Sequence, residues 1–433
     1  MNKKGFFLIL ILLIFSNCSF DTKSGIWTEK EKISKEKDDK VIKNLFEKKI
    51  YNYKEFNTDL KINTPLRISI NKDNHLKNNL GPQFVKENLK NKSKYKFSKI
   101  EDFEYFSPEL IFIDNDIIFF DNKGSILRFG DDSKIVWKKN YYSKSEKKLF
   151  SMLNFTLNNE VLIVSDNLSK YYALDVRTGE LLWTKDHNTL FISELKIDGD
   201  KFYAVDSDNT LNCFSIKNGD VLWKFRTENK LIKTQKKLSI VIDLNSVYFN
   251  NSKGDIYSLN KISGNLNWIY LGESQLSSAK TFFVKTSQLV IDEQNLYFSD
   301  VNGSFYSLEK RSGFLKWKQD LKTLFLPIIS NNLIFLVSDD GYFFIIESES
   351  GNILRVNNLL KYQKKNNKLK IFGFALSDKK IYLSLNSRKM IEANISDPSQ
   401  VSSIKVGGGR LSKPIINNGN LYLIKDDEII KFH

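Results

Sequence analysis

The sequence predicts an all-β fold in which one four-stranded unit is repeated around a closed ring. Three observations predict it: a recurring motif, a nearly constant spacing between its tryptophans, and runs of alternating apolar and polar residues before each copy. The motif is clearest at residues 171–186, YYALDVRTGELLWTKD, and returns at 211–225, 256–270 and 305–319. Its closing tryptophans, 40 to 49 residues apart, are Trp137, Trp183, Trp223, Trp268 and Trp317.

Repeats of this length are typical of propeller blades. One unit can be followed from residue 326 to residue 355: LPIIS, then NLIFLVSD, a turn, FFIIES, a Ser-Gly turn, and NILRV. The alternation within such runs indicates half-buried strands. Because four antiparallel strands cannot bury both faces alone, the units are expected to stack around an axis as a β-propeller.

The number of blades follows from where the units end. Units end near residues 137, 183, 223, 268, 317, 355 and 406, and a last one at 413–432 contains only three strands. An open ring would leave sheet edges unpaired, so the missing strand must come from the N-terminal side. PLRISI (65–70) is the candidate. The prediction is an eight-bladed β-propeller of four-stranded antiparallel blades, with seven blades as the alternative.

The residues that recur from copy to copy have structural interpretations. The motif glycines stand where a tight turn needs a positive φ, which glycine adopts without steric cost. Asp175 is expected to accept hydrogen bonds from turn amides. Each tryptophan is expected to cover the joint with the next blade. No ligand is needed to explain these residues. The glycines are Gly179, Gly219, Gly264, Gly313 and Gly351.

The N-terminus predicts a secretory signal. Lys3 and Lys4 precede the apolar run GFFLILILLIF and the small residues before Cys18. A cysteine in this place resembles the lipobox of bacterial lipoproteins, which implies lipid attachment at Cys18, although Phe15 and Asn17 differ from the usual pattern; a plain cleaved signal is the alternative. Ser19 resembles the sorting pattern for the outer membrane.

The predicted domains are a signal peptide over residues 1–17, a lipidated cysteine and charged tether over 18–64, and the propeller over 65–433, with its N-terminal strand closing the last blade. The stretch after residue 20 carries mixed charges and few apolar residues, so it cannot bury enough surface to offset the entropy of ordering.

The composition excludes several kinds of site. With Cys18 and Cys213 as the only cysteines, a disulfide framework and a cysteine-built metal site are excluded. His75, His187 and His433 are scattered without motif spacing, so they are expected at the surface and not in a catalytic or zinc centre. The net charge is +15, but only eight of the 66 basic residues are arginines, which disfavours nucleic-acid binding.

The motifs YALDVRTGELLW and YSLEKRSGFLKW resemble the tryptophan-docking repeat of pyrroloquinoline-quinone-type propellers, over about residues 65–433. One branch of that family comprises quinone-dependent dehydrogenases, which implies a central cofactor, a calcium ion held by carboxylates and, commonly, two adjacent cysteines. This chain has no adjacent cysteines and only short loops, so no cofactor, metal or enzymatic activity is predicted. A quinone-dependent dehydrogenase-like propeller is kept as an alternative.

The other branch comprises the BamB-type lipoproteins of the outer-membrane β-barrel assembly complex. This resemblance implies a non-enzymatic scaffold, lipid-anchored at the periplasmic face of the outer membrane and monomeric within a hetero-complex. It implies docking on the periplasmic domains of the barrel-inserting subunit and aid to unfolded outer-membrane proteins. A generic periplasmic interaction propeller is a further alternative.

Family resemblance also implies where the partner binds. The loop after the outer strand of the third blade supplies apolar and basic contacts in that family, and here this loop is residues 224–239. An apolar pair beside cations is usual for a small contact with a polar rim. The candidate partner-binding residues are Leu231, Ile232, Lys233, Gln235 and Lys236.

Overall fold

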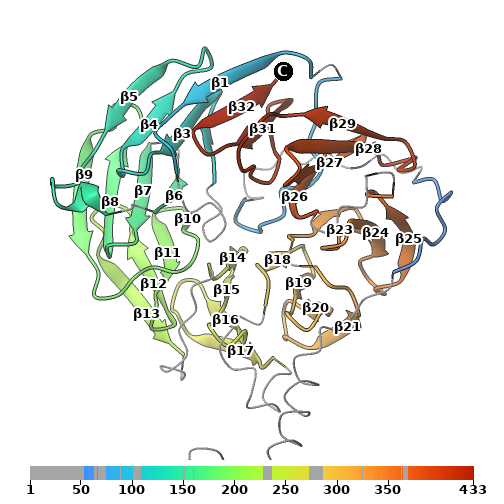
Figure 1. Ribbon diagram of the computed structural model, residues 1–433. Helices are drawn as coiled ribbons and strands as arrows, with labels where there is room; N and C mark the ends of the chain where they lie inside the picture. Colours follow the sequence, from blue (N-terminus) through green and yellow to red (C-terminus); the bar gives the residue numbers. More distant parts are fainter. Residues whose placement is uncertain are drawn as a thin grey trace, which may run out of the picture. The chain divides into compact units, whose positions relative to one another are not determined.

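The chain forms a ring of eight four-stranded antiparallel sheets, which confirms the eight-bladed β-propeller and excludes the seven-bladed alternative (Figure 1). The structure is a computed structural model. It describes the following residues: 53–62, 66, 75–87, 89–100, 109–149, 152–158, 160–227, 237–272, 286–323, 325–361, 363 and 369–433.

Blades 1 to 4 each use four consecutive strands, given from the centre of the ring outward. Blade 1 consists of β2 (Ile111–Ile113), β3 (Asp116–Phe120), β4 (Ile126–Phe129) and β5 (Ile135–Lys139). Blade 2 consists of β6 (Leu153–Leu157), β7 (Val161–Asp166), β8 (Lys170–Asp175) and β9 (Leu181–Asp186). Blade 3 consists of β10 (Lys196–Asp198), β11 (Lys201–Val205), β12 (Thr210–Ser215) and β13 (Val221–Arg226). Blade 4 consists of β14 (Ile240–Ile242), β15 (Ser246–Asn250), β16 (Ile256–Asn260) and β17 (Leu266–Tyr270).

Blades 5 to 7 repeat this order, and blade 8 combines the two ends of the propeller. Blade 5 consists of β18 (Val290–Ile291), β19 (Asn295–Ser299), β20 (Phe305–Glu309) and β21 (Leu315–Gln319). Blade 6 consists of β22 (Ile328–Ser330), β23 (Leu333–Val337), β24 (Tyr342–Glu347) and β25 (Ile353–Asn358). Blade 7 consists of β26 (Ile371–Leu376), β27 (Lys380–Leu385), β28 (Lys389–Asn394) and β29 (Val401–Lys405). Blade 8 consists of β30 (Ile415–Asn417), β31 (Asn420–Ile424), β32 (Glu428–Phe432) and β1 (Lys92–Lys96).

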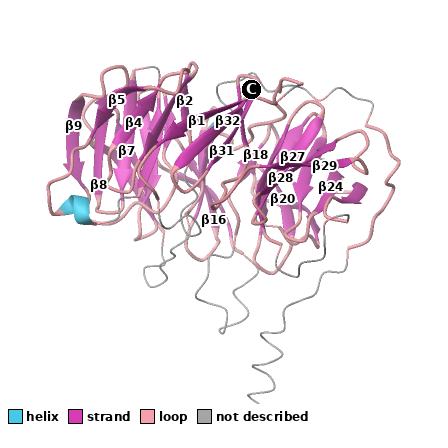
Figure 2. Cartoon of the chain, turned by 45° about the horizontal axis from the view of Figure 1, so that its top comes forward, coloured by secondary structure: helices cyan, strands magenta, loops and turns pink. Residues whose placement is uncertain are grey.

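Helix is almost absent from the described residues. One short 3₁₀ helix, η2 (Glu146–Lys148), lies beside β8 and β9 (Figure 2). None of the helices in the described ranges is long and apolar enough to span a bilayer.

The core lies between neighbouring blades, because each sheet buries both of its faces. In the middle strand β11, Phe202 and Tyr203 point to opposite faces, and both are fully buried. Phe202 packs in a hydrophobic cluster with residues of blade 2, and Tyr203 packs in another cluster with residues of blade 4. The outer strands alternate between exposed and half-buried positions, as β9 does. This is why the motif reads as alternating while the middle strands read as nearly continuous apolar runs.

The strand that closes the ring is β1 and not the predicted segment 65–70. β1 pairs in antiparallel register with β32 along its whole length, from Lys92 opposite Phe432 to Lys96 opposite Glu428. Sequence patterning misses it because Tyr95 is its only large apolar residue, fully buried between lysines. Leu66, from the segment that was predicted to close the ring, is buried instead among residues of blades 6 and 7.

Residues 53–62, here called the N-terminal clasp, lie against the outer edge of blade 6 (Figure 1). These residues belong to the stretch 18–64 that the sequence predicted to be a tether. Phe56 makes an antiparallel bridge to Val356 of β25, with N–H···O distances of 3.1 and 2.9 Å in the two directions. Glu55 forms an ion pair with Lys361 at 2.7 Å. Hydrophobic patterning does not detect these contacts, because most residues of this stretch are charged or polar.

Candidate functional site

Each motif copy forms a tight turn that its own side chains stabilise. In blade 2, Oδ1 of Asp175 accepts the backbone N–H groups of Arg177 at 2.9 Å and Thr178 at 2.8 Å. The hydrogen bond from the N–H of Thr178 lowers the pKa of Asp175 most, the bond from Arg177 adds to it, and together they outweigh the opposing effect of burial. Gly179 follows with φ +72°, the left-handed region that favours glycine.

The turn also receives the tryptophan of the preceding blade. The ring of Trp183 lies on Gly219 so closely that a Cβ on this glycine would fall 2.6 Å from Cζ3. The indole Nε1–H of Trp183 donates to the carbonyl of Ile216 at 2.8 Å. Glycine is therefore required for space as well as for φ, a reason that the sequence did not suggest. The same approach joins Trp137 to Gly179, Trp223 to Gly264, Trp268 to Gly313, and Trp317 to Gly351.

Trp223 differs from the other docking tryptophans in its hydrogen bonding. Its Nε1–H is buried without a hydrogen-bond partner among the described residues. At the other joints the indole N–H donates to the carbonyl at the position of Lys261. Here the hydroxyl of Tyr203 donates to that carbonyl instead, at 3.1 Å. The joint between blades 3 and 4 thus depends on ring packing more than on an indole hydrogen bond.

Arg355 stands where blade 6 would have its tryptophan, and it performs a related task. Its side chain is fully buried, and Nη2 donates to the carbonyl of Ile395 in the turn of blade 7. Nη1 donates to the carbonyl of Leu60 in the N-terminal clasp at 2.7 Å. Burial lowers the pKa of this guanidinium to about 10, so it remains charged at neutral pH. One arginine therefore joins blade 6 both to blade 7 and to the clasp.

The predicted attachment and partner-binding residues are not among those that the structure describes. Cys18 precedes residue 53, where the description begins, and residues 228–236 are also outside it. The described ends of that loop are Thr227, buried at the end of β13, and Lys237, whose Nζ lies 3.5 Å from Oε1 of Glu109. The five candidate partner-binding residues of this loop therefore stay a prediction from the sequence.

The inner strands are crossed by residues 75–86, here called the central segment. The carbonyls of Leu76 and Lys77 accept N–H groups from blades 4 and 5, and Asn79 makes paired bonds of 3.0 and 3.1 Å with the backbone of Ile329 in blade 6. Gln83 and Val85 form parallel bridges to blades 7 and 8. The segment thus joins consecutive blades at their inner ends.

A buried polar cluster fixes the central segment to blade 3. The amide of Asn78 lies 2.7 Å from Oε1 of Glu194, and its oxygen accepts from Nζ of Lys196 at 2.5 Å. Lys196 and Glu194 also form an ion pair at 3.3 Å, with both side chains almost fully buried. Because a buried charge needs both pairing and hydrogen bonds, this cluster specifies where residue 78 lies. Sequence analysis gave no role to these residues, since no local motif connects them.

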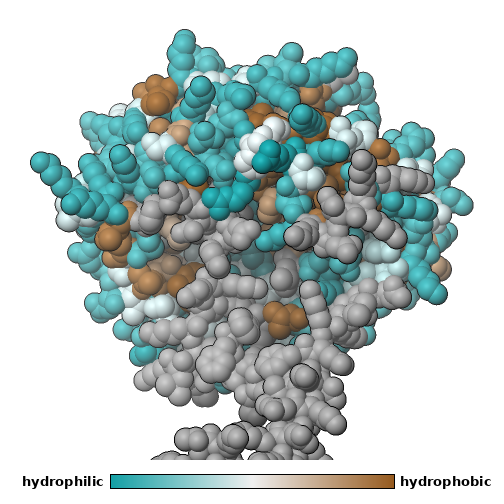
Figure 3. Space-filling view, viewed as in Figure 1, coloured by the Kyte–Doolittle hydropathy of each residue, from teal (hydrophilic) through white to brown (hydrophobic). Residues whose placement is uncertain are grey.

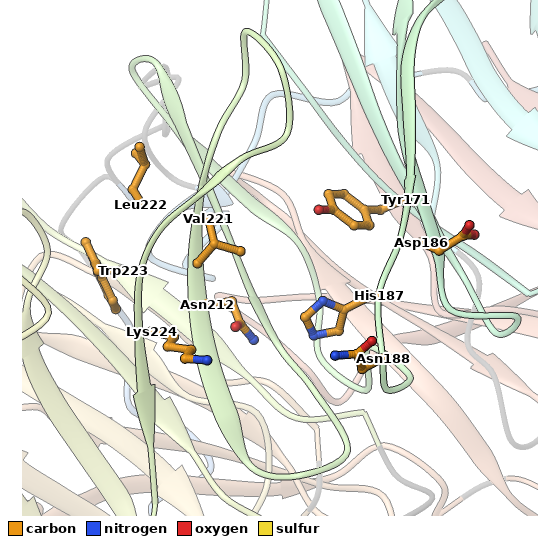
Figure 4. A pocket seen from close by; sticks show the side chains of 9 residues that line it. All are labelled: Tyr171, Asp186, His187, Asn188, Asn212, Val221, Leu222, Trp223 and Lys224. Carbon is orange, nitrogen blue, oxygen red and sulfur yellow. The ribbon is translucent and has the colours of Figure 1, made fainter.

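A pocket of about 470 Å³ opens between blades 2 and 3 (Figure 4). His187 lies in its wall, stacked on Phe191 with a ring distance of 4.5 Å and with Nε2 3.2 Å from Oδ2 of Asp206. It is half-buried and paired, unlike the surface histidine that was expected. Burial favours a raised pKa for Asp206, but the bonds from His187 and from neighbouring N–H groups outweigh it and lower the pKa. The lining residues are Tyr171, Asp186, His187, Asn188, Asn212, Val221, Leu222, Trp223 and Lys224.

Two kinds of reactive group, a metal-binding cluster and a free thiol, can be assessed among the described residues. Within them, no three His, Cys, Asp or Glu side chains come together in a way that could hold a metal ion. Cys213 is fully buried, and burial raises the pKa of its thiol to about 12, so the nucleophilic thiolate does not form at neutral pH.

These features define a class: an eight-bladed β-propeller whose blades are joined by tryptophan docking and whose inner strands are crossed by its own N-terminal side. The family model described as "Outer membrane protein assembly factor BamB" matches residues 122–357, more than half of the chain. The chain belongs to this family. A comparison with curated proteins gives no match.

Solved structures agree on the fold. BamB from Moraxella catarrhalis superimposes with a TM-score of 0.62 and 16% sequence identity, covering 79% of this chain and 100% of that protein. The computationally designed Ika8 protein gives a TM-score of 0.58 at 12% identity, covering 78% and 99%. The C-terminal WD40 domain of Sif2 gives 0.56 at 10% identity, covering 75% and 96%. At these identities the likeness concerns the fold alone.

Proposed function

We propose that this protein is a non-enzymatic scaffold of outer-membrane protein assembly. It docks on the periplasmic domains of the barrel-inserting subunit and aids delivery of unfolded outer-membrane proteins. The observation that carries the proposal is the family match over residues 122–357, which spans the tryptophan-docked blades. The N-terminal sequence adds support, because a signal followed by Cys18 fits a lipoprotein anchored at the periplasmic face of the outer membrane.

The docking site that we propose is the loop after the outer strand of blade 3. It begins at the end of β13 and carries Leu231, Ile232, Lys233, Gln235 and Lys236. An apolar pair flanked by lysines suits a partner surface that is apolar at its centre and acidic at its rim.

A binding experiment with purified proteins tests this site. The full chain is titrated with the isolated periplasmic domains of the barrel-inserting subunit, and Leu231→Glu is compared with the unchanged protein. Leu244→Glu is the matched control, because Leu244 is an exposed leucine in the β14–β15 turn, 87% accessible. We expect Leu231→Glu to weaken binding at least about tenfold, a loss of about 1.4 kcal/mol, and Leu244→Glu to leave it unchanged. Equal binding by both variants would remove the loop from the site.

The quinone-dependent alternative is tested separately. A ligand that binds only the folded state raises the melting temperature by mass action. If quinone and calcium at saturation leave the melting temperature unchanged, the dehydrogenase reading is refuted; a rise would refute the non-enzymatic proposal. The central segment supports the expectation of no shift, because its backbone and Asn78 already bond to the inner strands that would surround a central cofactor.

A further inference from the structure

The outer edge of blade 6 is an occupied peptide-binding site within the molecule itself. Tyr53 of the N-terminal clasp packs edge-on against Tyr342 and Phe344, at ring distances of 5.5 and 5.2 Å. Its hydroxyl accepts the backbone N–H of Lys322, from the loop after blade 5, at 2.6 Å. Phe56 then bridges to Val356 at the edge of β25. An aromatic anchor in the notch between two blades is thus followed by strand addition.

The pocket between blades 2 and 3 is the same notch at another joint. Asn188 lies five residues after Trp183, as Lys322 lies five residues after Trp317. Lys224 directly follows the docking residue of its blade, as Val356 does. Asn188 and Lys224 both line the pocket, at the sequence positions of the two residues whose backbone groups bind the clasp at blade 6.

The strand register supports this equivalence. Asn212 is opposite Lys224 in blade 3, and Phe344 is opposite Val356 in blade 6. The backbone N–H and C=O of Lys224 therefore point away from β12, as those of Val356 point away from β24 toward Phe56. At blade 3, the outer edge of β13 presents the same hydrogen-bonding groups to an added strand.

The walls of this notch differ from those around Tyr53, because Thr210 and Asn212 stand at the positions of Tyr342 and Phe344. The aromatic rings that line it are instead those of Tyr171, His187 and Trp223. Figure 4 shows Tyr171, His187 and Asn188 on one side of the pocket and the residues of β13 on the other. Val221 is 47% exposed at the position of the half-buried Ile353 in blade 6, which packs in the same cluster as Tyr53. In Figure 3 hydrophobic patches interrupt the hydrophilic surface on the left, the side where blades 2 and 3 lie in Figure 1.

Charge completes the description of the occupant. At blade 6, Glu55 accepts the backbone N–H of Asn358 at 3.3 Å and pairs with Lys361. The residue that corresponds to Asn358 at blade 3 is Arg226, 46% exposed in its side chain and paired with Asp208 at 3.0 Å. An acidic residue at the place of Glu55 in an added strand would face the backbone N–H of Arg226, beside the ion pair of Arg226 with Asp208.

We propose that the notch between blades 2 and 3 binds an extended segment of a partner protein. The segment inserts a tyrosine between Asn188 and Val221, pairs its backbone with Lys224, and carries an acidic residue toward Arg226. This recognition is of the type in which main-chain bonds give affinity and a side-chain pocket gives specificity. The site goes beyond the proposed docking through residues 231–236, because it uses a strand edge and a notch formed by two blades.

The probe that tests the site is a fluorescein-labelled synthetic peptide of residues 53–62, YKEFNTDLKI, added to the full-length protein. Fluorescence anisotropy measures its binding to the unchanged protein, to Val221→Glu and to Leu266→Glu. Leu266 is the matched control, since it also lies two residues before a docking tryptophan, is 43% exposed and lies outside the pocket. A peptide with Tyr53→Ala tests the anchor.

We expect saturable binding that Val221→Glu weakens at least tenfold, that Leu266→Glu leaves unchanged, and that Tyr53→Ala in the peptide also weakens at least tenfold. Absence of saturable binding up to about 1 mM, the weak end of specific recognition, would overturn the proposal. So would equal binding to Val221→Glu and the unchanged protein, which would place the peptide elsewhere, such as in exchange at blade 6. Self-association of the protein that Val221→Glu abolishes would assign the notch to a second copy and overturn the assignment to a partner. The peptide assay contains no barrel-assembly subunit, so its outcome is independent of the proposed function.

Discussion

Replacing Gly219 by Ala tests how neighbouring blades are joined. A Cβ at this position would lie 2.6 and 2.8 Å from Cζ3 and Cη2 of Trp183, closer than real Cβ contacts allow. The ring must move, which also lengthens its 2.8 Å bond to Ile216. The left-handed φ of +73° costs an alanine about 1–2 kcal/mol, overpacking about 1–3 and the weakened bond about 1. We expect a total loss of about 3–6 kcal/mol in the free energy of unfolding.

Gly199→Ala is the control that separates backbone strain from docking. Gly199 has a φ of +60° in the turn before β11, and nothing lies within 4 Å of the added Cβ. Only the backbone cost of about 1–2 kcal/mol remains there. Urea titrations followed by circular dichroism measure the free energy of unfolding of both variants and the unchanged protein. Equal losses in the two variants would refute the argument that the glycine is needed for the tryptophan.

Three further predictions concern stability and reactivity. Arg355→Ala leaves the carbonyls of Leu60 and Ile395 unpaired and opens a cavity, so we expect a loss of about 3–5 kcal/mol and faster proteolysis within the N-terminal clasp; unchanged cleavage would contradict the clasp contact. Burial raises the pKa of the Cys213 thiol to about 12, so iodoacetamide at pH 8 should modify it only on unfolding, as followed by mass spectrometry of its peptide; rapid labelling of the native protein would count against this burial. Burial alone would raise the pKa of Glu428, but the ammonium groups of Lys425 and Lys94 outweigh burial and lower this pKa. The stability that the Glu428 carboxylate contributes is therefore present above about pH 4.3 and is lost as the pH falls through the folded-state pKa. Glu428→Gln should weaken the dependence of the free energy of unfolding on pH in acid, as measured by urea titration at several pH values, and an unchanged dependence would contradict the pairing.

The repeat was predictable because its residues act locally and periodically. The turn at Asp175 and Gly179 depends on neighbours within a few residues, so one copy of the motif is enough to recognise it. The docking of each tryptophan repeats at a blade spacing, and it therefore leaves a period in the sequence. The number of blades followed from this period and from the need to close the ring.

The parts that sequence reasoning missed are those that occur once. β1 closes the ring although it has a single large apolar residue, Tyr95. The segment at 65–70 is more apolar, so hydrophobic patterning favoured it, and that prediction of the closing strand was wrong. Asn78 finds Glu194 more than a hundred residues away, and no local spacing predicts such a contact. The notch at Asn188 is visible only when blades 2 and 3 are placed side by side.

The proposal that this protein is an assembly scaffold is tested most directly by affinity capture of the full-length protein from detergent-solubilised native membranes, with mass spectrometry of the proteins that co-purify. The account predicts recovery of the barrel-inserting subunit in near-equal amount, and loss of that subunit with Leu231→Glu but not with Leu244→Glu. Recovery of respiratory-chain proteins, or of no barrel-inserting subunit at all, would contradict it.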